Sequence, residues 1–197
     1  MYSVPELKDI LKIRLSKKRY THSMNVADSA VKLAETYGAD TSKAYLAGLL
    51  HDVCKEIPKD EQLEMVKKSD RSICPSELVT PPLFHAPAGA WYAENVLGIH
   101  DEDVLNAIRY HTIARAGMSM LEEIVYLADL ISADREYKDV GRMRRIAFVS
   151  LDTAMLEALR FSITDVVAKG SQLPVHTIDA YNMYAAKAKK AELTASK

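Results

Sequence analysis

The sequence predicts an all-α protein, and two observations support that prediction. Glycine and proline are scarce, with 7 of each among 197 residues, and they lie between periodic segments rather than inside them. Few stretches show the strict alternation of apolar and polar residues that is typical of a half-buried strand. Because a chain of this length fits one domain, a single helical domain over residues 1–197 is expected.

Three helices are expected in the first 54 residues. Ser3 and Glu6 form a capping-box pattern ahead of an amphipathic first helix. A second helix is expected over residues 20–37, because Gly38 is a typical residue just after a helix C-terminus. A third, over residues 42–54, is apolar almost all round (AYLAGLLHDVC), so it should lie in the core.

The rest of the chain predicts helices that are separated by glycine and proline. CPSELVTPPLFHAP predicts a loop with one turn. Ser119 and Glu122 form a second capping box, whereas Gly170 and Pro174 interrupt the last third. Helices are therefore expected over residues 59–68, 89–97, 104–110, 119–131, 141–169 and 177–191, the last two ranges forming two or three helices.

Composition and charge exclude several classes of protein. Lys and Arg number 26 and Asp and Glu 27, which argues against a nucleic-acid-binding protein that relies on a general basic field. The basic cluster RMRR at residues 142–145 is interpreted as a solvated helix face. No apolar run approaches the roughly 20 residues that span a bilayer. Two cysteines without a CxxC pair indicate a reduced, cytoplasmic protein.

Two carboxylates interrupt apolar segments. Asp52 follows His51 inside LAGLLHDVCKE, and Asp129 lies four residues after Val125 in EEIVYLADLIS, on the same helix face. A carboxylate among apolar side chains costs several kcal/mol unless it is paired, protonated or bound to a metal. Either acid is also compatible with a helix edge that reaches solvent, so the pattern alone leaves both interpretations open.

Histidines recur in the same neighbourhoods. His22 and His111 lie on apolar faces of expected helices, and His85 lies in a proline-flanked loop, FHAPAGA. His100 precedes an acidic N-cap and is interpreted as a surface residue. Taken singly, each of the others is more typical of a packed or capping histidine than of a metal ligand. Together they give the order H…HD…H…H…D, formed by His22, His51, Asp52, His85, His111 and Asp129.

Imidazole and carboxylate ligands in this order favour a divalent first-row metal such as iron, manganese, cobalt or zinc. The absence of thiolate ligands argues against a structural zinc finger. His51 and Asp52 would leave a helix about 100° apart, so both can ligate at its edge and Asp52 can bridge two ions. Six ligands suffice for a pair of ions with open positions, which suits in-line attack at phosphorus.

The motifs around these residues are similar to those of a known family. They are RYTHSMNVADSA, AGLLHDVCKE, AIRYHT, IVYLADLIS-x-x-R and LPVHTIDAYN. The order resembles the HD-domain metal-dependent phosphohydrolases, and within them the YqeK family of bacterial symmetrical bis(5′-nucleosyl)-tetraphosphatases. The resemblance runs from about residue 10 to about residue 185. It implies an all-α HD-domain helical bundle, with a metal-binding core at about residues 18–135 and C-terminal helices at about 141–191 that complete a nucleotide pocket.

The resemblance also implies an activity and site residues. The family cleaves diadenosine tetraphosphate symmetrically to two ADP by metal-activated hydroxide, with one or two ions, iron before manganese or cobalt. By correspondence the metal ligands are His22, His51, Asp52 and Asp129, with His85 and His111 facing a second ion or the phosphates. The implied catalytic residues are Asp52, Lys55 and Arg135. The implied substrate contacts are His22, Lys55, His85, His111, Thr112, Asp129, Arg135, Ser171, His176, Thr177 and Asn182.

Several of these residues also have simpler interpretations. Lys55 shares a helix face with His51 and Asp52, where it can neutralise phosphate charge, yet it also fits a solvated helix end. Thr177 is well placed to cap the last helix, and Arg135 alone would be a surface residue. Two departures from the family pattern border the expected phosphate pocket, Ala86-Pro87 after the loop histidine and Ser132-Ala133-Asp134 after the last acid.

Alternative functions remain open from the sequence. One is an HD-type nucleotide phosphatase or deoxynucleotide hydrolase, and another is a non-catalytic HD module that senses nucleotides. The expected partner is a small dinucleoside polyphosphate, with ADP as the product, rather than a nucleic acid or a membrane. A homodimer is compatible with the sequence.

Overall fold

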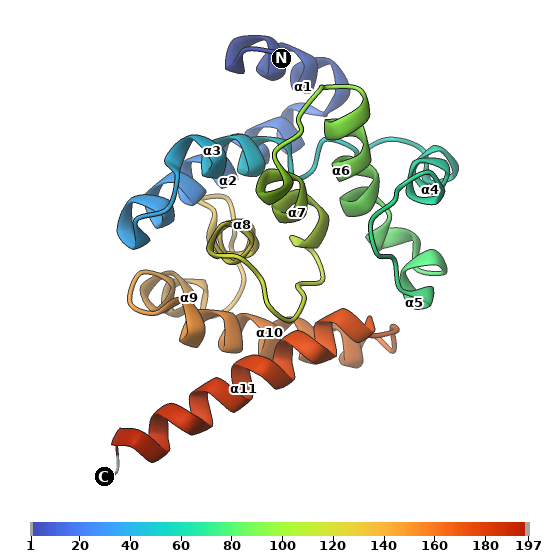
Figure 1. Ribbon diagram of the computed structural model, residues 1–197. Helices are drawn as coiled ribbons and strands as arrows, with labels where there is room; N and C mark the ends of the chain where they lie inside the picture. The colour runs from blue at the N-terminus through green and yellow to red at the C-terminus, as the bar shows by residue number, and fades with distance from the viewer. Residues whose placement is uncertain (1, 196–197) are drawn as a thin grey trace.

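The structure is a computed structural model that describes residues 2–195. Over this range it contains eleven α-helices and one short 3₁₀ turn, with no strand, which confirms the predicted all-α class (Figure 1). The helices are α1 (Val4–Arg14), α2 (Lys17–Tyr37), α3 (Thr41–Leu50), α4 (Lys59–Lys67), α5 (Pro75–Leu78), α6 (His85–Asn95), α7 (Glu102–Tyr110), α8 (Met120–Ile131), α9 (Val140–Ala147), α10 (Leu151–Ala168) and α11 (Val175–Ala195), with the 3₁₀ turn η1 (Pro81–Leu83) before α6.

Helix α8 runs through the middle of the molecule. It contacts α2, α3 and α7 on one side and α9 and α10 on the other (Figure 1). Helix α3 is enclosed by α2, α7 and α8, as its apolar sequence predicts, and its last two leucines, Leu49 and Leu50, are fully buried. This packing brings together, around α8, the chain segments that carry Asp52, Asp129 and the histidines of the H…HD…H…H…D pattern.

The close approach of α2 and α3 depends on Gly48. A Cβ atom at this position would lie 2.9 Å from the Ala27 Cα and 3.2 Å from the Val26 carbonyl oxygen. Both are backbone atoms, so neither can rotate away, and the two helices would have to separate. The Gly48 carbonyl also accepts a hydrogen bond from His51, which ties this contact to the site described below.

Replacing Gly48 by alanine should destabilise the protein by about 1–3 kcal/mol, because overpacking forces backbone shifts. Gly141 provides a control within α9, since a Cβ there meets only the Arg145 Nη1 at 3.9 Å. The G141A change should be neutral or stabilise by up to about 1 kcal/mol through helix propensity. Urea unfolding of both variants tests the difference, and equal midpoints would contradict the tight contact.

Several boundaries differ from the sequence-based expectations, and four of them affect the site. Helix α2 begins at Lys17, earlier than expected, because Ser16 caps it. Helix α3 ends at Leu50 rather than at residue 54, and tight turns follow it. The expected loop over residues 74–87 contains α5 and η1 as well, and His85 opens α6 instead of lying in that loop. Proline is tolerated in the first turn of a helix, so Pro87 does not prevent this early start.

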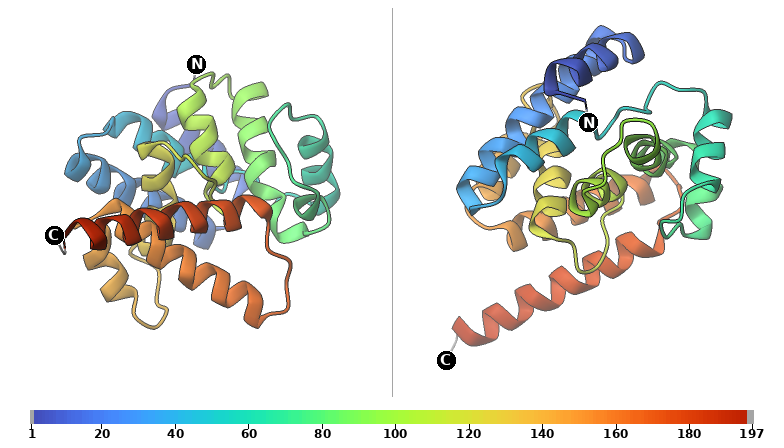
Figure 2. Two further views of the ribbon diagram at one scale, coloured as in Figure 1. Left: turned by 60° about the horizontal axis from the view of Figure 1, so that its bottom comes forward. Right: turned by 45° about the horizontal axis from the view of Figure 1, so that its top comes forward.

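The C-terminal helices α10 and α11 pack against each other (Figure 2). Helix α11 lies across α10, and its C-terminal end projects beyond the rest of the molecule (Figure 2). Tyr184 attaches α11 to the core, because its buried hydroxyl donates to the Glu123 carboxylate of α8. None of the described helices combines the length and the apolar character needed to cross a bilayer.

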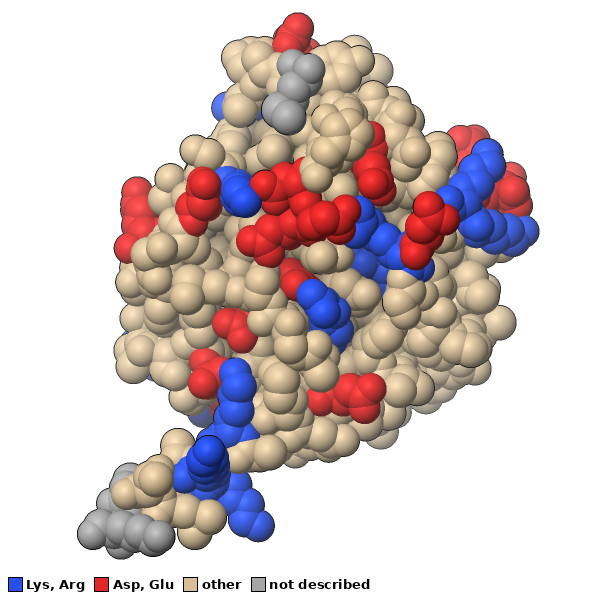
Figure 3. All heavy atoms as spheres, in the orientation of Figure 1, with Lys and Arg blue, Asp and Glu red and all other residues tan. Residues whose placement is uncertain are grey.

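Charged side chains of both signs are interspersed on the face shown in Figure 3, with acidic groups gathered near the start of α7 and basic groups along the end of α11. No single-sign field covers this face.

The basic cluster at residues 142–145 is less solvated than predicted, since Arg144 donates to the carbonyls of Ile131, Ser132 and Arg135 at 2.9, 2.8 and 3.1 Å. The prediction of a solvated face is therefore wrong for Arg144, which holds the turn after α8 in place.

Candidate metal centre

Six ionisable side chains from five parts of the chain meet beside α8. His22 comes from the first half of α2, His111 from the C-terminal end of α7, and Asp129 from the last turn of α8. The remaining three are His51 and Asp52, from the turns after α3, and His85, the first residue of α6. The four imidazoles and Asp52 are each no more than 4% exposed.

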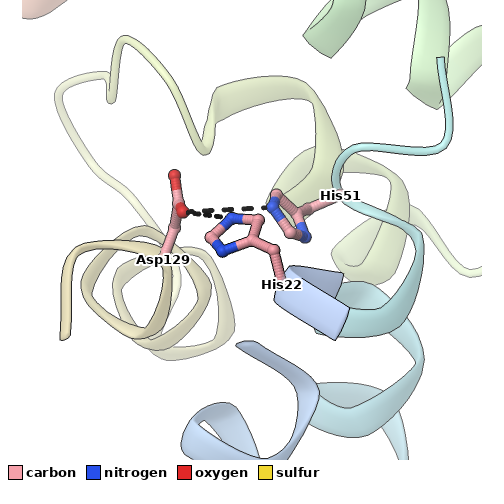
Figure 4. A group of neighbouring side chains, drawn as sticks. All are labelled: His22, His51 and Asp129. Atoms are coloured by element: carbon pink, nitrogen blue, oxygen red, sulfur yellow. Dashed lines mark ion pairs between the residues drawn. The ribbon is translucent and has the colours of Figure 1, made fainter. Parts of the chain in front are cut away.

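The imidazoles form a row in which His22, His51, His111 and His85 follow one another. Neighbouring ring centroids lie 5.2, 4.9 and 5.2 Å apart. At one end of the row the Asp129 Oδ1 lies 2.9 Å from the His22 Nε2 and 4.0 Å from the His51 Nε2 (Figure 4). These three side chains can supply three ligands to one ion.

Asp52 lies between the two halves of the row. Its Oδ2 is 3.5 Å from the His51 Nε2, whereas its Oδ1 is 3.6 Å from the His111 Nε2 and 3.3 Å from the His85 Nε2. The two oxygens of this one carboxylate thus face different histidine pairs. His51, Asp52 and His111 form a second group that could hold an ion, and this group shares His51 with the first.

The outer nitrogen of each imidazole is hydrogen-bonded to an oxygen outside the cluster. A carbonyl or carboxylate oxygen can only accept, so each Nδ1 carries the proton and each Nε2 presents its lone pair inward. The four bonds run from His22 to the Asp134 carboxylate at 2.8 Å, from His51 to the Gly48 carbonyl at 2.7 Å, from His85 to the Pro82 carbonyl at 2.9 Å and from His111 to the Ile108 carbonyl at 2.7 Å.

Several inward-facing atoms are left without a hydrogen-bond partner. Among the described residues they include the buried His22 Nε2, His51 Nε2 and Asp52 Oδ1. Lone pairs that face one another and a carboxylate in a buried site repel unless a cation lies between them. Imidazole nitrogen and carboxylate oxygen are the donors that divalent first-row metals prefer. The cluster therefore fits a divalent metal ion.

The electrostatics of the cluster are consistent with metal binding. Burial and the neighbouring Lys55 ammonium hold the pKa of His85 well below its usual value, and burial lowers the pKa of His111. Burial alone would raise the pKa of Asp52. The nearby imidazoles, His51 above all, lower it more strongly, so the pKa of Asp52 is well below its usual value. Burial likewise opposes protonation of His51, yet Asp52 outweighs it and raises the pKa of His51. The field of the carboxylates attracts positive charge to the cluster.

Three further side chains of the predicted site border the cluster. The Lys55 Nζ donates to the His85 Nε2 at 2.9 Å and lies 3.7 Å from the Asp52 Oδ1. The Thr112 Oγ1 lies 3.1 Å from the His111 Nε2 and 3.3 Å from the His85 Nε2. Arg135 donates from its Nε to the Asp129 carbonyl at 2.7 Å and from an Nη to the carboxylate of the same residue. Each presents a hydrogen-bonding group at the rim of the cluster.

Two residues at the cluster were not singled out from the sequence. Arg19 donates from its Nη1 to the Asp52 Oδ2 at 2.8 Å. Asp134 accepts hydrogen bonds from both His22 and Asn25, and these outweigh burial and lower the pKa of Asp134 to about 2. Arg19 lies three residues before His22 on one helix face, a spacing that could have identified it. Asp134, in contrast, is 112 residues from His22 and carries no local signal.

A cavity of about 310 Å³ begins beside the cluster and extends toward the C-terminal helices. Thr112, Ser171 and Thr177 line it, together with Pro82. The interpretation of Thr177 as an N-cap is wrong, because α11 begins at Val175 and the Thr177 hydroxyl instead donates to the Ile113 carbonyl at 2.7 Å.

The structure does not bring two of the predicted substrate contacts into this cavity. Asn182 is exposed in a separate hollow beside Arg160. His176 lies edge-on to the Tyr110 ring, with 5.9 Å between the ring centroids, next to Cys74 and Glu77.

His100 is exposed, as predicted. Cys54 is a packed thiol, with burial raising its pKa to about 12.

The sequence matches a protein family over a range that includes all six residues of this cluster. Residues 19–134, from the start of α2 to the turn after α8, match the HD domain. The chain belongs to the HD-domain family. The adjacent His51 and Asp52 lie within the matched range, and both side chains lie at the centre of the cluster.

Known proteins are similar to this chain over nearly its full length. A protein of Bacillus subtilis (strain 168) named symmetrical bis(5′-nucleosyl)-tetraphosphatase is 36% identical, over 87% of this chain and 92% of that protein. A protein of Staphylococcus aureus (strain NCTC 8325 / PS 47) with the same name is 35% identical, over 92% of this chain and 94% of that protein. A crystal structure described as a predicted HD superfamily hydrolase involved in NAD metabolism, from Clostridium acetobutylicum, is 40% identical. It superposes with a TM-score of 0.91 over 95% of this chain and 99% of that one.

Proposed function

We propose that this HD-domain protein is a metal-dependent phosphohydrolase that cleaves diadenosine tetraphosphate symmetrically into two ADP. The observation that carries the proposal is the row of inward-facing imidazole nitrogens around the shared Asp52 carboxylate. The names and the near full-length similarity of the relatives support the choice of substrate.

His22, His51, Asp52 and Asp129 would hold the principal ion, with His85 and His111 facing a second ion or the phosphates. The family resemblance implies iron, with manganese or cobalt as alternatives, and ligands that are imidazoles and carboxylates without thiolates are compatible with each of these metals. A divalent ion supplies Lewis acidity, which activates water near neutral pH and offsets phosphate charge.

The remaining residues bind and orient the polyphosphate. Arg135 is held against Asp129 by two of its nitrogens and can turn its third toward a phosphate oxygen. Lys55 and Thr112 present donors next to His85, at the same rim. Charge that spreads over the phosphoryl oxygens during in-line displacement is stabilised by such preorganised donors.

One adenosine would occupy the 310 Å³ cavity beside Thr112, in contact with Ser171 and Thr177. In this proposal the whole chain forms one domain, and the helices after residue 141 complete the nucleotide pocket. A cytoplasmic location fits the two free, buried cysteines. The homodimer stays a prediction.

Product analysis tests the proposal. Protein loaded with Fe²⁺ or Mn²⁺ should convert diadenosine tetraphosphate to ADP as the sole product by anion-exchange chromatography, and a sample treated with a chelator should be at least about 100-fold slower. AMP and ATP as products would contradict symmetrical cleavage. Release of inorganic phosphate from mononucleotides, with the dinucleotide untouched, would favour the nucleotide phosphatase. Binding without turnover would favour the sensing module.

A further inference from the structure

A second cavity adjoins the metal centre at the His22 end of the imidazole row. Its volume is about 370 Å³, within the range of about 300–1,000 Å³ that small-molecule sites occupy. The first cavity begins at Thr112, beside His85 at the other end of the row. The two cavities therefore open at opposite ends of the cluster. The second is lined by Lys18, Arg19, His22, Asp134, Arg135, Glu136 and Tyr137.

Three cations line this second cavity, and each has a donor group without a hydrogen-bond partner among residues 2–195. Arg19 donates one hydrogen bond, from its Nη1 to Asp52, and its side chain is 30% exposed. Its Nε and Nη2 make no hydrogen bond within residues 2–195, so they remain as donors. Lys18 is exposed and forms no ion pair within the same range. Arg135, 36% exposed, borders both the cavity and Asp129.

The two acids of the lining do not cancel these cations. Asp134 already accepts hydrogen bonds at both oxygens, from His22 at 2.8 Å and from Asn25 at 3.0 Å. Glu136 is the only other acid of the lining, so cations outnumber acids. Lys18 and Arg19 also lie in the first turn of α2, where a helix favours negative charge. Basic residues at that position are unfavourable for the helix itself, whereas their charge favours an anion in the cavity.

An aromatic side chain completes the lining. Tyr137 stacks on Phe161, with ring centroids 4.7 Å apart and planes 27° from parallel. This contact fixes the orientation of the Tyr137 ring where it borders the cavity. Bases stack on such rings with about 1–3 kcal/mol each. The cavity thus combines donors for phosphate with a surface for a nucleoside.

The geometry points to a subsite for the second nucleotide of a dinucleoside polyphosphate, in the cavity lined by Lys18, Arg19, Arg135 and Tyr137. The inference rests on the proposed function, and it explains symmetrical cleavage. A substrate with two equal halves is cut at its middle when one half lies in each cavity and the central anhydride lies over the cluster between them. Lys18 and Arg19 bind the phosphates of the second half, and Tyr137 contacts its nucleoside.

Binding of two ligands tests the subsite. The probes are ADP, which fills one cavity, and the P2,P3-methylene analogue of diadenosine tetraphosphate, which reaches both and is not cleaved. Calorimetry on manganese-loaded wild-type protein should give at least about 10-fold tighter binding of the analogue than of ADP, through linkage of two halves. In the Lys18→Glu and Tyr137→Leu variants, the dissociation constants of the analogue and of ADP should differ by no more than about threefold. The affinity for ADP in the first cavity should stay at the wild-type value.

Lys32→Glu provides the matched control, because Lys32 is an exposed lysine on the same helix outside the cavity. It should keep the wild-type ratio. If Lys18→Glu keeps that ratio too, the subsite is contradicted, even where wild-type protein cleaves diadenosine tetraphosphate. Wild-type protein that does not cleave this substrate contradicts the proposed function instead, so the two failures are distinguishable.

Discussion

Replacement of Asp52 by asparagine should abolish hydrolysis of diadenosine tetraphosphate, with kcat lower by about 10³-fold or more. Both Asp52 oxygens face imidazole nitrogens, and its charge is the one shared by the two halves of the row. Asparagine keeps the shape but removes the charge and replaces one oxygen by a donor. That donor can bond one inward-facing Nε2, which reduces the repulsion between lone pairs in the absence of a metal.

The fold should therefore survive this change while metal binding is lost. Turnover, metal content by elemental analysis and melting temperature are measured together on D52N. Asp70→Asn serves as the control, since Asp70 is exposed and outside the cluster; it should retain both metal and turnover. A D52N protein with a full complement of metal and near wild-type kcat would show that Asp52 is not the shared ligand.

The largest effect on stability is expected at a buried ion pair away from the cluster. Arg109 is fully buried, and its Nη2 donates to the Glu77 Oε2 at 2.9 Å and to the Ser72 carbonyl at 2.7 Å. The same Nη2 lies 2.8 Å from the Glu77 Oε1, which makes this a buried ion pair. Replacing Glu77 by leucine leaves the guanidinium charge without its partner, which costs about 3–5 kcal/mol. Urea unfolding should show this loss in the free energy of unfolding.

A double variant separates the charge from the loss of contacts. Two Arg109 nitrogens, Nε and Nη1, have no hydrogen-bond partner, so the buried pair is costly even when intact. Glu77→Leu with Arg109→Met should recover most of the stability, because apolar residues replace buried ion pairs at little cost. Glu102→Ala, which removes a carboxylate 68% exposed, is the control and should cost at most about 1 kcal/mol. Additive losses in the double variant would contradict the account.

Features with a local sequence signal were predicted well. The capping box at Ser119 and Glu122 opens α8 as expected, and Gly38 ends α2. The six clustered side chains were identified because imidazoles and carboxylates stand out in apolar segments. Their roles in binding the metal and the substrate stay predictions, since they rest on resemblance.

Features that depend on distant partners were missed. Helix α3 ends early because the chain turns at His51, with bonds such as the one from the Val53 amide to the Leu50 carbonyl at 3.0 Å. His51 and Asp52 face the same cluster from this turn rather than from the edge of a continuing helix. The bond from Arg144 to Ser132 joins helices α9 and α8, and no periodicity reports such a pairing. The sequence shows which ionisable residues lie in apolar segments, whereas the fold determines their hydrogen-bond and ion-pair partners.

Cleavage in ¹⁸O-labelled water tests the central claim most directly. Manganese-loaded protein is incubated with diadenosine tetraphosphate in this solvent, and the nucleotides are analysed by mass spectrometry. Water that attacks at the central anhydride leaves one ¹⁸O atom on one of the two products. The account predicts ADP as the only nucleotide product, with about half of its molecules labelled. Labelled AMP or ATP would show that an outer anhydride is cleaved and would contradict symmetrical cleavage at this metal centre.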